Sequence, residues 1–179
     1  MRIRINQNEK SKFTRMCISE AIVSLLKNTP LDKVKISDIA KRAGVSRMSF
    51  YKYYHSSHAA LNDYLDIIIS EYLQKSDADR ITNEFLNYDH ILYALKFFDK
   101  YADFFLTLAR QEQYSIMING INQFMVEHIY PEKEISVYEL YSYAGALLNT
   151  FLKWEENGKK ESAEELACTI CKMYRTKEQ

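Results

Sequence analysis

The sequence predicts an all-α protein of about nine helices. The chain has only four Gly and two Pro in 179 residues, whereas β and α/β folds need many more turn residues. Apolar residues recur at helical spacing along most of the chain, and no segment has the alternation of a strand. With 47% apolar and 27% charged residues, the composition is that of a globular protein with a real core.

The charge is distributed unevenly along the chain. Residues 1–60 carry twelve Lys/Arg against four Asp/Glu, a balance of +8, and the remaining 119 residues carry twelve against twenty, which is −8. A basic end joined to an acidic body indicates that one end meets a polyanion.

Cellular location can also be predicted from composition. No apolar run is long enough to span a membrane, and the N-terminus lacks the apolar segment of a secretory signal. Three cysteines fit a reducing cytoplasm better than a disulfide framework. We therefore expect a cytoplasmic protein without a membrane partner.

Three helices are expected in the basic part. The first covers residues 11–27, with an apolar stripe at fourfold spacing, and Pro30 follows it. The second covers 36–43 and is followed by Gly44, where a helix commonly ends with positive φ. Ser46 then caps a third helix that ends near the "YYHSS" stretch. The apolar stripe of the first helix is Phe13, Cys17, Ala21 and Leu25, with Ile18 and Ile22 beside it.

The acidic part contains the other six helices by the same criterion of apolar spacing. They are expected at about 57–74, 88–99, 101–110, 113–129, 135–156 and 161–175. Pro131 and Gly158 interrupt the pattern at the two positions where a helix should end.

The second and third helices, joined by a tight turn containing Gly44, form a helix-turn-helix. Phe50 and Tyr54 are four residues apart, so they share one face of the third helix, which we expect to be buried. The opposite face would enter the major groove of DNA. The predicted DNA-binding residues are Ser46, Arg47, Met48, Ser49, Tyr51, Lys52 and Tyr53.

These residues can make two kinds of contact. Arg47 can bind guanine, or Met48 can pack against a thymine methyl, and both would read the base sequence. Lys52 supplies a cation to the backbone, and Tyr51 and Tyr53 can donate hydrogen bonds to phosphate oxygens. The alternative is a packed helical hairpin with a solvated basic face, but the charge surplus and the spacing favour DNA binding.

The stretch "VKISDIAKRAGVSRMSFYKYYHSSHAAL" resembles the DNA-binding domain of the tetracycline-repressor (TetR/AcrR) family, over about residues 10–60. The resemblance implies a homodimeric regulator, by preference a repressor, that binds a double-stranded operator. Residues 1–56 would form the DNA-binding domain, and residues 57–179 a larger helical domain for ligand binding and dimerisation. The chain departs from the family pattern at Tyr54 (usually Phe), Ser57 (usually Lys) and Met48 (often Gly).

Aromatic residues are crowded between residues 61 and 130. Tyrosines at half-buried positions suit a pocket with a few polar groups on an apolar wall, which would take a small apolar or aromatic ligand. The alternative is a core built from large side chains. The predicted pocket residues are Tyr64, Ile68, Tyr93, Phe97, Phe104, Met117 and Phe124.

The last two helices carry flat apolar stripes, with small residues in the middle of the first. Two such helices from each subunit would make a four-helix dimer interface. The run "GALLNTFLKWEENG" also resembles the C-terminal region of one subgroup of small regulators in the family. The alternative is a packing face within one chain. The predicted interface residues are Tyr141, Ala144, Gly145, Leu148, Leu152, Leu166 and Ile170.

We expect no enzyme activity, no cofactor and no metal site. Cys168 and Cys171 form a single C-x-x-C, which we interpret as helix packing because no second pair accompanies it. No other catalytic or phosphate-binding motif is present in the sequence. The remaining alternatives to a DNA-binding regulator are a helical ligand-binding or interaction module without operator binding and, third, a helical enzyme.

Overall fold

In the computed structural model of the chain, residues 7–79, 87–129 and 136–175 are described, and this part folds into nine α-helices without a strand. The all-α prediction is thereby confirmed. The helices are α1 (Gln7–Leu26), α2 (Ile36–Ala43), α3 (Arg47–Tyr53), α4 (Ser57–Ala78), α5 (Tyr88–Asp99), α6 (Ala102–Arg110), α7 (Tyr114–Phe124), α8 (Val137–Glu156) and α9 (Ala163–Arg175), with a 3-10 turn η1 (Leu31–Lys33) and a π-helical turn η2 (Met125–Ile129).

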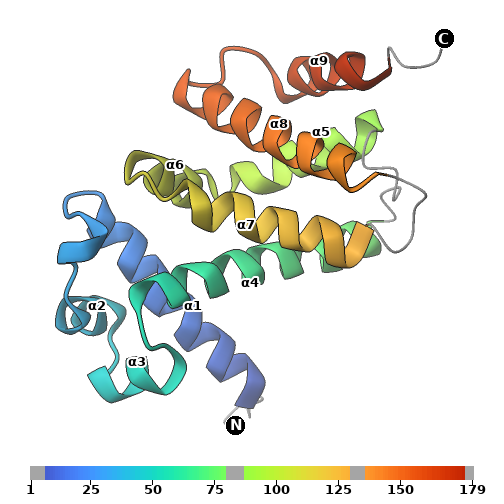
Figure 1. Cartoon of the computed structure of the whole chain (residues 1–179). Helices are drawn as coiled ribbons and strands as arrows, with labels where there is room; N and C mark the ends of the chain where they lie inside the picture. Colours follow the sequence, from blue (N-terminus) through green and yellow to red (C-terminus); the bar gives the residue numbers. More distant parts are fainter. Residues whose placement is uncertain (1–6, 80–86, 130–135, 176–179) are drawn as a thin grey trace, which may run out of the picture.

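The helices stack between two ends of the molecule (Figure 1). α1, α2 and α3 lie together at one end, and α8 and α9 lie at the other. α4 starts beside α3 and crosses to the middle, where it packs against α7, and α5 packs against α9. α4 therefore connects the three-helix end to the middle of the molecule.

Several helix boundaries follow from capping residues. Ser46 caps α3 by accepting a hydrogen bond from the amide of Ser49, at 3.0 Å, as predicted. Ser56 caps α4 through the amide of Ala59, at 3.1 Å. Such caps satisfy backbone donors that have no partner inside the helix. α1 begins and α4 ends four residues outside the predicted ranges.

The core of the three-helix end is assembled from α1, α2, α3 and α4. Ile18, Ile22, Ile39 and Phe50 are fully buried there. Phe13 was expected on the buried stripe of α1, but its side chain is 70% exposed. The prediction was wrong because Phe13 lies in the first turns of α1, ahead of the fully buried stripe that starts at Ile18.

Gly120 of α7 lies against α4. A Cβ atom built on Gly120 would lie 2.4 Å from Cδ2 of Leu65, a side chain that is itself buried. A larger residue at position 120 would therefore force the buried Leu65 side chain of α4 to shift.

Gly44 provides the turn of the helix-turn-helix. It follows α2 with φ of 68° and ψ of 28°, and its amide donates to the carbonyls at the end of α2. This left-handed conformation is unfavourable for residues with a Cβ atom.

Gly44→Ala should lower the free energy of unfolding by about 1–2 kcal/mol, because alanine must adopt the left-handed conformation. An added Cβ would meet nothing within 4 Å, so a steric clash cannot account for the effect. Gly44→Asn is the matched control and should lose less, because asparagine tolerates this conformation. Urea unfolding measures both variants, and equal stability of Gly44→Ala and the wild type would contradict the role of the turn.

The described residues lack both a membrane-spanning helix and a cluster of metal-binding side chains. No helix among them combines the length and the apolar character that a membrane crossing requires. Nor do three or more His, Cys, Asp or Glu side chains of these residues gather where they could hold a metal ion.

Candidate nucleic-acid interface and internal cavity

The two faces of α3 differ sharply in exposure. Phe50 is fully buried and Tyr54, which follows the helix, is 5% exposed. On the other face Met48 is 84% exposed and Tyr51 is 60% exposed. The predicted separation of a packing face from a displayed face is therefore correct.

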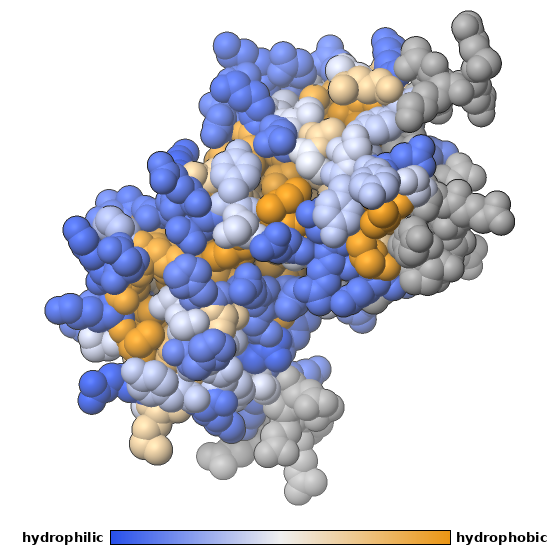
Figure 2. All heavy atoms as spheres, viewed as in Figure 1, coloured by the Kyte–Doolittle hydropathy of each residue, from blue (hydrophilic) through white to orange (hydrophobic). Residues whose placement is uncertain are grey.

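The predicted DNA-binding residues all lie at this displayed end of the molecule. Ser46, Arg47, Met48, Tyr51 and Lys52 are exposed, whereas Ser49 and Tyr53 are half-buried. The surface here is mostly hydrophilic (Figure 2). Lys41 and Arg42, exposed in the last turn of α2, add two cations that were not among the predicted contacts.

Local contacts restrain several of these side chains. The ring of Tyr51 meets the ring of Phe50 edge to face, with centroids 5.7 Å apart. Lys52 Nζ lies 5.5 Å from the centroid of the Tyr53 ring. Ser46 Oγ lies 2.9 Å from Ser49 Oγ in addition to its capping bond.

This arrangement combines exposed cations, phenol groups and one apolar side chain on a short helix. Cations and phenols can bind phosphate oxygens, and Arg47 and Met48 stand at the helix N-terminus, where base edges are read in helix-turn-helix proteins. Because Ser46 is engaged in capping, we interpret it mainly as fixing the start of α3. The displayed face suits a nucleic-acid backbone and groove.

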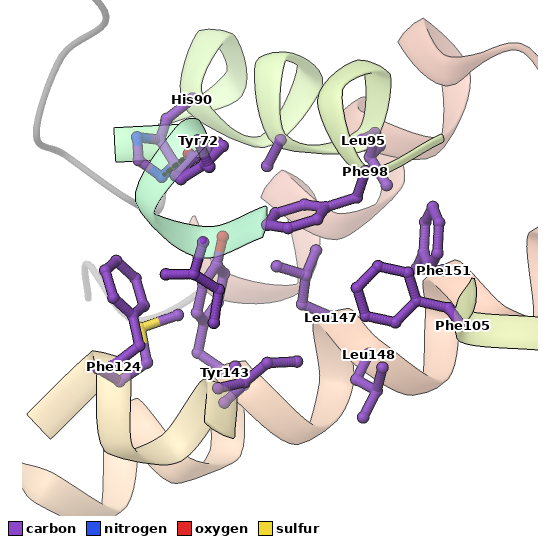
Figure 3. A pocket seen from close by; sticks show the side chains of 15 residues that line it. Tyr72, His90, Leu95, Phe98, Phe105, Phe124, Tyr143, Leu147, Leu148 and Phe151 are labelled. Atoms are coloured by element: carbon purple, nitrogen blue, oxygen red, sulfur yellow. Dashed lines mark hydrogen bonds between the residues drawn. The ribbon is translucent and has the colours of Figure 1, made fainter. Parts of the chain in front are cut away.

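A second feature is a partly open cavity of about 70 Å³ in the other half of the molecule, between α4, α5, α6, α7, η2 and α8 (Figure 3). Its walls are almost entirely apolar. The lining residues are Ile69, Tyr72, His90, Ala94, Leu95, Phe98, Phe105, Ile121, Phe124, Met125, Tyr143, Ala144, Leu147, Leu148 and Phe151.

Three lining residues carry polar atoms. Tyr72 Oη and His90 Nε2 are hydrogen-bonded at 2.9 Å at one side of the cavity, and Tyr143 extends from α8 toward its middle (Figure 3). Burial raises the pKa of the Tyr72 and Tyr143 phenols, so both remain protonated at neutral pH. Among the lining residues described there is no Lys, Arg, Asp or Glu. The cavity therefore suits an uncharged group better than a charged one.

The predicted pocket residues need correction. Of the seven, only Phe124 lines this cavity in the described structure. Tyr64 packs its ring edge-on against Phe104 at 5.2 Å, away from the cavity, and Tyr93 donates a hydrogen bond to Asp79 at 3.0 Å. The remaining predicted pocket residues, Ile68, Phe97 and Met117, are buried in the core outside the cavity lining. The prediction failed because apolar spacing identifies a buried face but does not distinguish filled core from open space.

The predicted dimer interface separates into two groups. Ala144, Leu148, Leu152 and Ile170 are buried within the single chain, and the first two line the cavity. These four contacts are corrected to packing within one chain, because a side chain that is already buried has little surface left for a partner.

The second group of predicted interface residues lies on the exposed side of α8 and α9, which we call the outer face. Tyr141 is 48% exposed, and Gly145 and Leu166 are half-buried. Tyr138 and Met173, which were not predicted, are 83% and 64% exposed. Cys168 is exposed while Cys171 is buried, so only Cys171 fits the interpretation of this pair as helix packing.

The N-terminal part of the chain is similar to known sequences. Residues 18–61 match the family described as bacterial regulatory proteins, tetR family. HTH-type transcriptional regulator EthR of Mycobacterium tuberculosis is 40% identical over 48 residues, which cover 27% of this chain and 22% of EthR. The match thus spans about a fifth of the length of the curated relatives.

The whole fold is similar to solved structures of low sequence identity. Lin0861 from Listeria innocua has a TM-score of 0.78 at 14% identity, covering 96% of this chain and 94% of its own. The transcriptional regulator FadR from Bacillus subtilis, solved in complex with stearoyl-CoA, has a TM-score of 0.57 at 16% identity, covering 88% and 96%. At these identities the likeness extends to the fold alone.

Proposed function

We propose, from the match of residues 18–61 to the tetR family of bacterial regulatory proteins, that the chain is a sequence-specific DNA-binding transcriptional regulator. Repression released by a small molecule is the mode that we favour. The DNA-binding domain would cover residues 1–56 and the regulatory domain 57–179. Such a regulator would act in the cytoplasm without catalytic residues of its own.

The observation that carries the proposal is the displayed face of α3. Its cations, phenols and Met48 stand away from a core that Phe50 anchors. A helix presented in this way can enter the major groove with its N-terminal residues at the base edges. The +8 balance of the first 60 residues supplies the long-range attraction to DNA.

A gel-shift assay with DNA from beside the gene tests this proposal. Binding should be competed only weakly by random duplex, and affinity should fall steeply as salt rises, because counterions leave the phosphates. If no duplex is bound even at low salt, the regulator proposal fails and the interaction-module alternative takes its place.

Dimerisation through the outer face of α8 and α9 is part of the same proposal. Exposed Tyr138, Tyr141 and Met173 give this face an apolar character that a second copy could cover. The face lies at the end of the molecule opposite α3, so a dimer formed there leaves both α3 helices free. Sedimentation equilibrium should give twice the 21.1 kDa mass of one chain, and a monomer at all concentrations would contradict dimerisation.

The cavity supports regulation by an apolar, uncharged ligand. At about 70 Å³ it is smaller than the roughly 150 Å³ cavity that holds benzene in an engineered protein. A ligand must therefore displace lining side chains as it enters. Ile69 and Tyr72 belong to α4, whose other end begins beside α3, so displacement there can change the position of α3 and weaken DNA binding.

A substitution at Ala94 tests the cavity as a ligand site. Octanol should raise the melting temperature of the wild-type protein more than octanoate does, because the cavity offers no cation to a carboxylate. Ala94→Leu should remove this response, because its side chain would occupy the space. Thermal melting with and without octanol measures both, and the circular-dichroism spectrum of Ala94→Leu is the control for an intact fold. Equal responses to the neutral and the anionic compound would contradict the ligand class.

A further inference from the structure

The C-terminal end of α3 is held by a polar cluster that involves three elements. Tyr54 Oη donates a hydrogen bond of 2.5 Å to Asp63 Oδ2. The Arg15 guanidinium contacts both oxygens of the same carboxylate. Nε donates to Oδ2 at 2.9 Å, and Nη2 lies 2.8 Å from Oδ1. Tyr54 follows α3, Arg15 lies on α1 and Asp63 lies on α4.

The contacts within this cluster are of the strong kind. A bidentate Arg–carboxylate pair and a phenol donating to an ionised carboxylate are both charge-assisted, and each fixes the direction of its partner. Burial and the neighbouring carboxylate raise the pKa of the Tyr54 phenol, so it stays protonated and remains the donor. Arg15 and Asp63 are only partly exposed, which limits competition from water.

α3 has few other restraints. It is seven residues long, and Phe50 is its only buried residue in the described structure. The Ser46 cap fixes its N-terminal end, and at the opposite end Tyr53 packs against the core from a half-buried position. Tyr54 adds a polar restraint at that end, because it is the C-cap of α3 and its hydroxyl reaches Asp63 on α4.

The hydroxyl of Tyr54 cannot be a DNA contact. Its side chain is 5% exposed and points toward Asp63, away from the face that displays Met48 and Tyr51. We propose that Arg15, Asp63 and Tyr54 form a clamp that sets the orientation of α3 against α1 and α4, and that Tyr54 is a positioning residue for DNA recognition. This inference rests on the proposed function, since it concerns the orientation of the helix that is proposed to read DNA.

The clamp also joins the reading helix to α4 directly. Ser19 Oγ donates to the Ala60 carbonyl at 3.1 Å, a buried bond that ties α1 to the same turn region of α4. A displacement of α4 would therefore move the end of α3 with it, because Asp63 links the two helices through Tyr54.

Tyr54→Phe tests the clamp with the loss of one oxygen atom. The probes are a duplex enriched by the wild-type chain from a randomised pool, and a scrambled duplex of the same composition. Affinity for the enriched duplex should fall about tenfold, as expected for a hydrogen bond to a charged group. Affinity for the scrambled duplex and the salt slope should stay unchanged, because no phosphate contact is lost.

Tyr53→Phe is the matched control, since it removes the same atom from the adjacent, half-buried tyrosine. It should lower the affinity for both duplexes by the same factor, so the ratio of the two affinities should not change. Asp63→Ala should reduce the ratio at least as much as Tyr54→Phe does, and the double variant should be no worse than Asp63→Ala alone. Circular-dichroism melting checks that each variant is folded.

The outcomes separate the clamp from the function on which it rests. An unchanged affinity ratio in Tyr54→Phe, or an equal loss on both duplexes, overturns the clamp while DNA recognition stands. Failure of the wild-type chain to enrich or bind any duplex overturns the proposed function, and the positioning role with it.

Discussion

Phe50→Ala should unfold the N-terminal domain. Phe50 is fully buried as the one buried residue of α3 in the described structure, and truncation of such a side chain costs about 3–5 kcal/mol. Small domains are stable by only about 5–15 kcal/mol in total. Denaturant unfolding followed by circular dichroism should therefore show a lower midpoint or a separate early transition.

Tyr51→Ala is the control for this experiment. Tyr51 is adjacent, aromatic and 60% exposed, so its truncation should change stability by less than about 0.5 kcal/mol. Its effect should instead appear in DNA affinity. If Phe50→Ala melts like the wild type while Tyr51→Ala unfolds, the assignment of the two faces of α3 is reversed.

Arg47→Ala should produce the largest loss of DNA binding. Arg47 is exposed at the first position of α3, from which a guanidinium can reach two acceptors of guanine. A contact of this type is worth about 1–3 kcal/mol, and a dimer loses it twice. We expect affinity for the preferred duplex to fall about a hundredfold or more, with relaxed preference at one base position of each half-site.

Lys52→Ala provides the contrast. Lys52 is a phosphate contact in this account, so its removal should weaken all sequences alike and reduce the salt slope by roughly one unit per contact. Gel shifts over a salt series with matched and mismatched duplexes distinguish the two substitutions. Should Arg47→Ala behave like Lys52→Ala on every duplex, Arg47 binds the backbone and base reading lies elsewhere on α3.

The helix-turn-helix end could be predicted closely from sequence because its signals are local. Gly44 marks the turn through its left-handed backbone, Ser46 marks the start of α3 through its cap, and Phe50 and Tyr54 share a face by spacing alone. Each of these features depends on residues within one helical turn, so the chain pattern specifies them directly.

The clamp and the cavity could not be predicted in this way because they depend on tertiary placement. Arg15 and Asp63 are 48 positions apart in sequence, and nothing in their spacing indicates that they meet. Ala144 and Leu148 belong to the apolar stripe that was predicted as a dimer interface, yet they line the cavity. Helical periodicity shows which face is buried but not which neighbour covers it.

Selection from a pool of randomised duplexes tests the central claim most directly. If α3 reads DNA in a dimer, the wild-type chain should enrich a near-palindromic sequence whose two half-sites lie about one helical turn or more apart. Arg47→Ala in a parallel selection should show a weaker preference at one position in each half-site. Recovery of no common sequence, with no duplex bound even at low salt, would contradict the account.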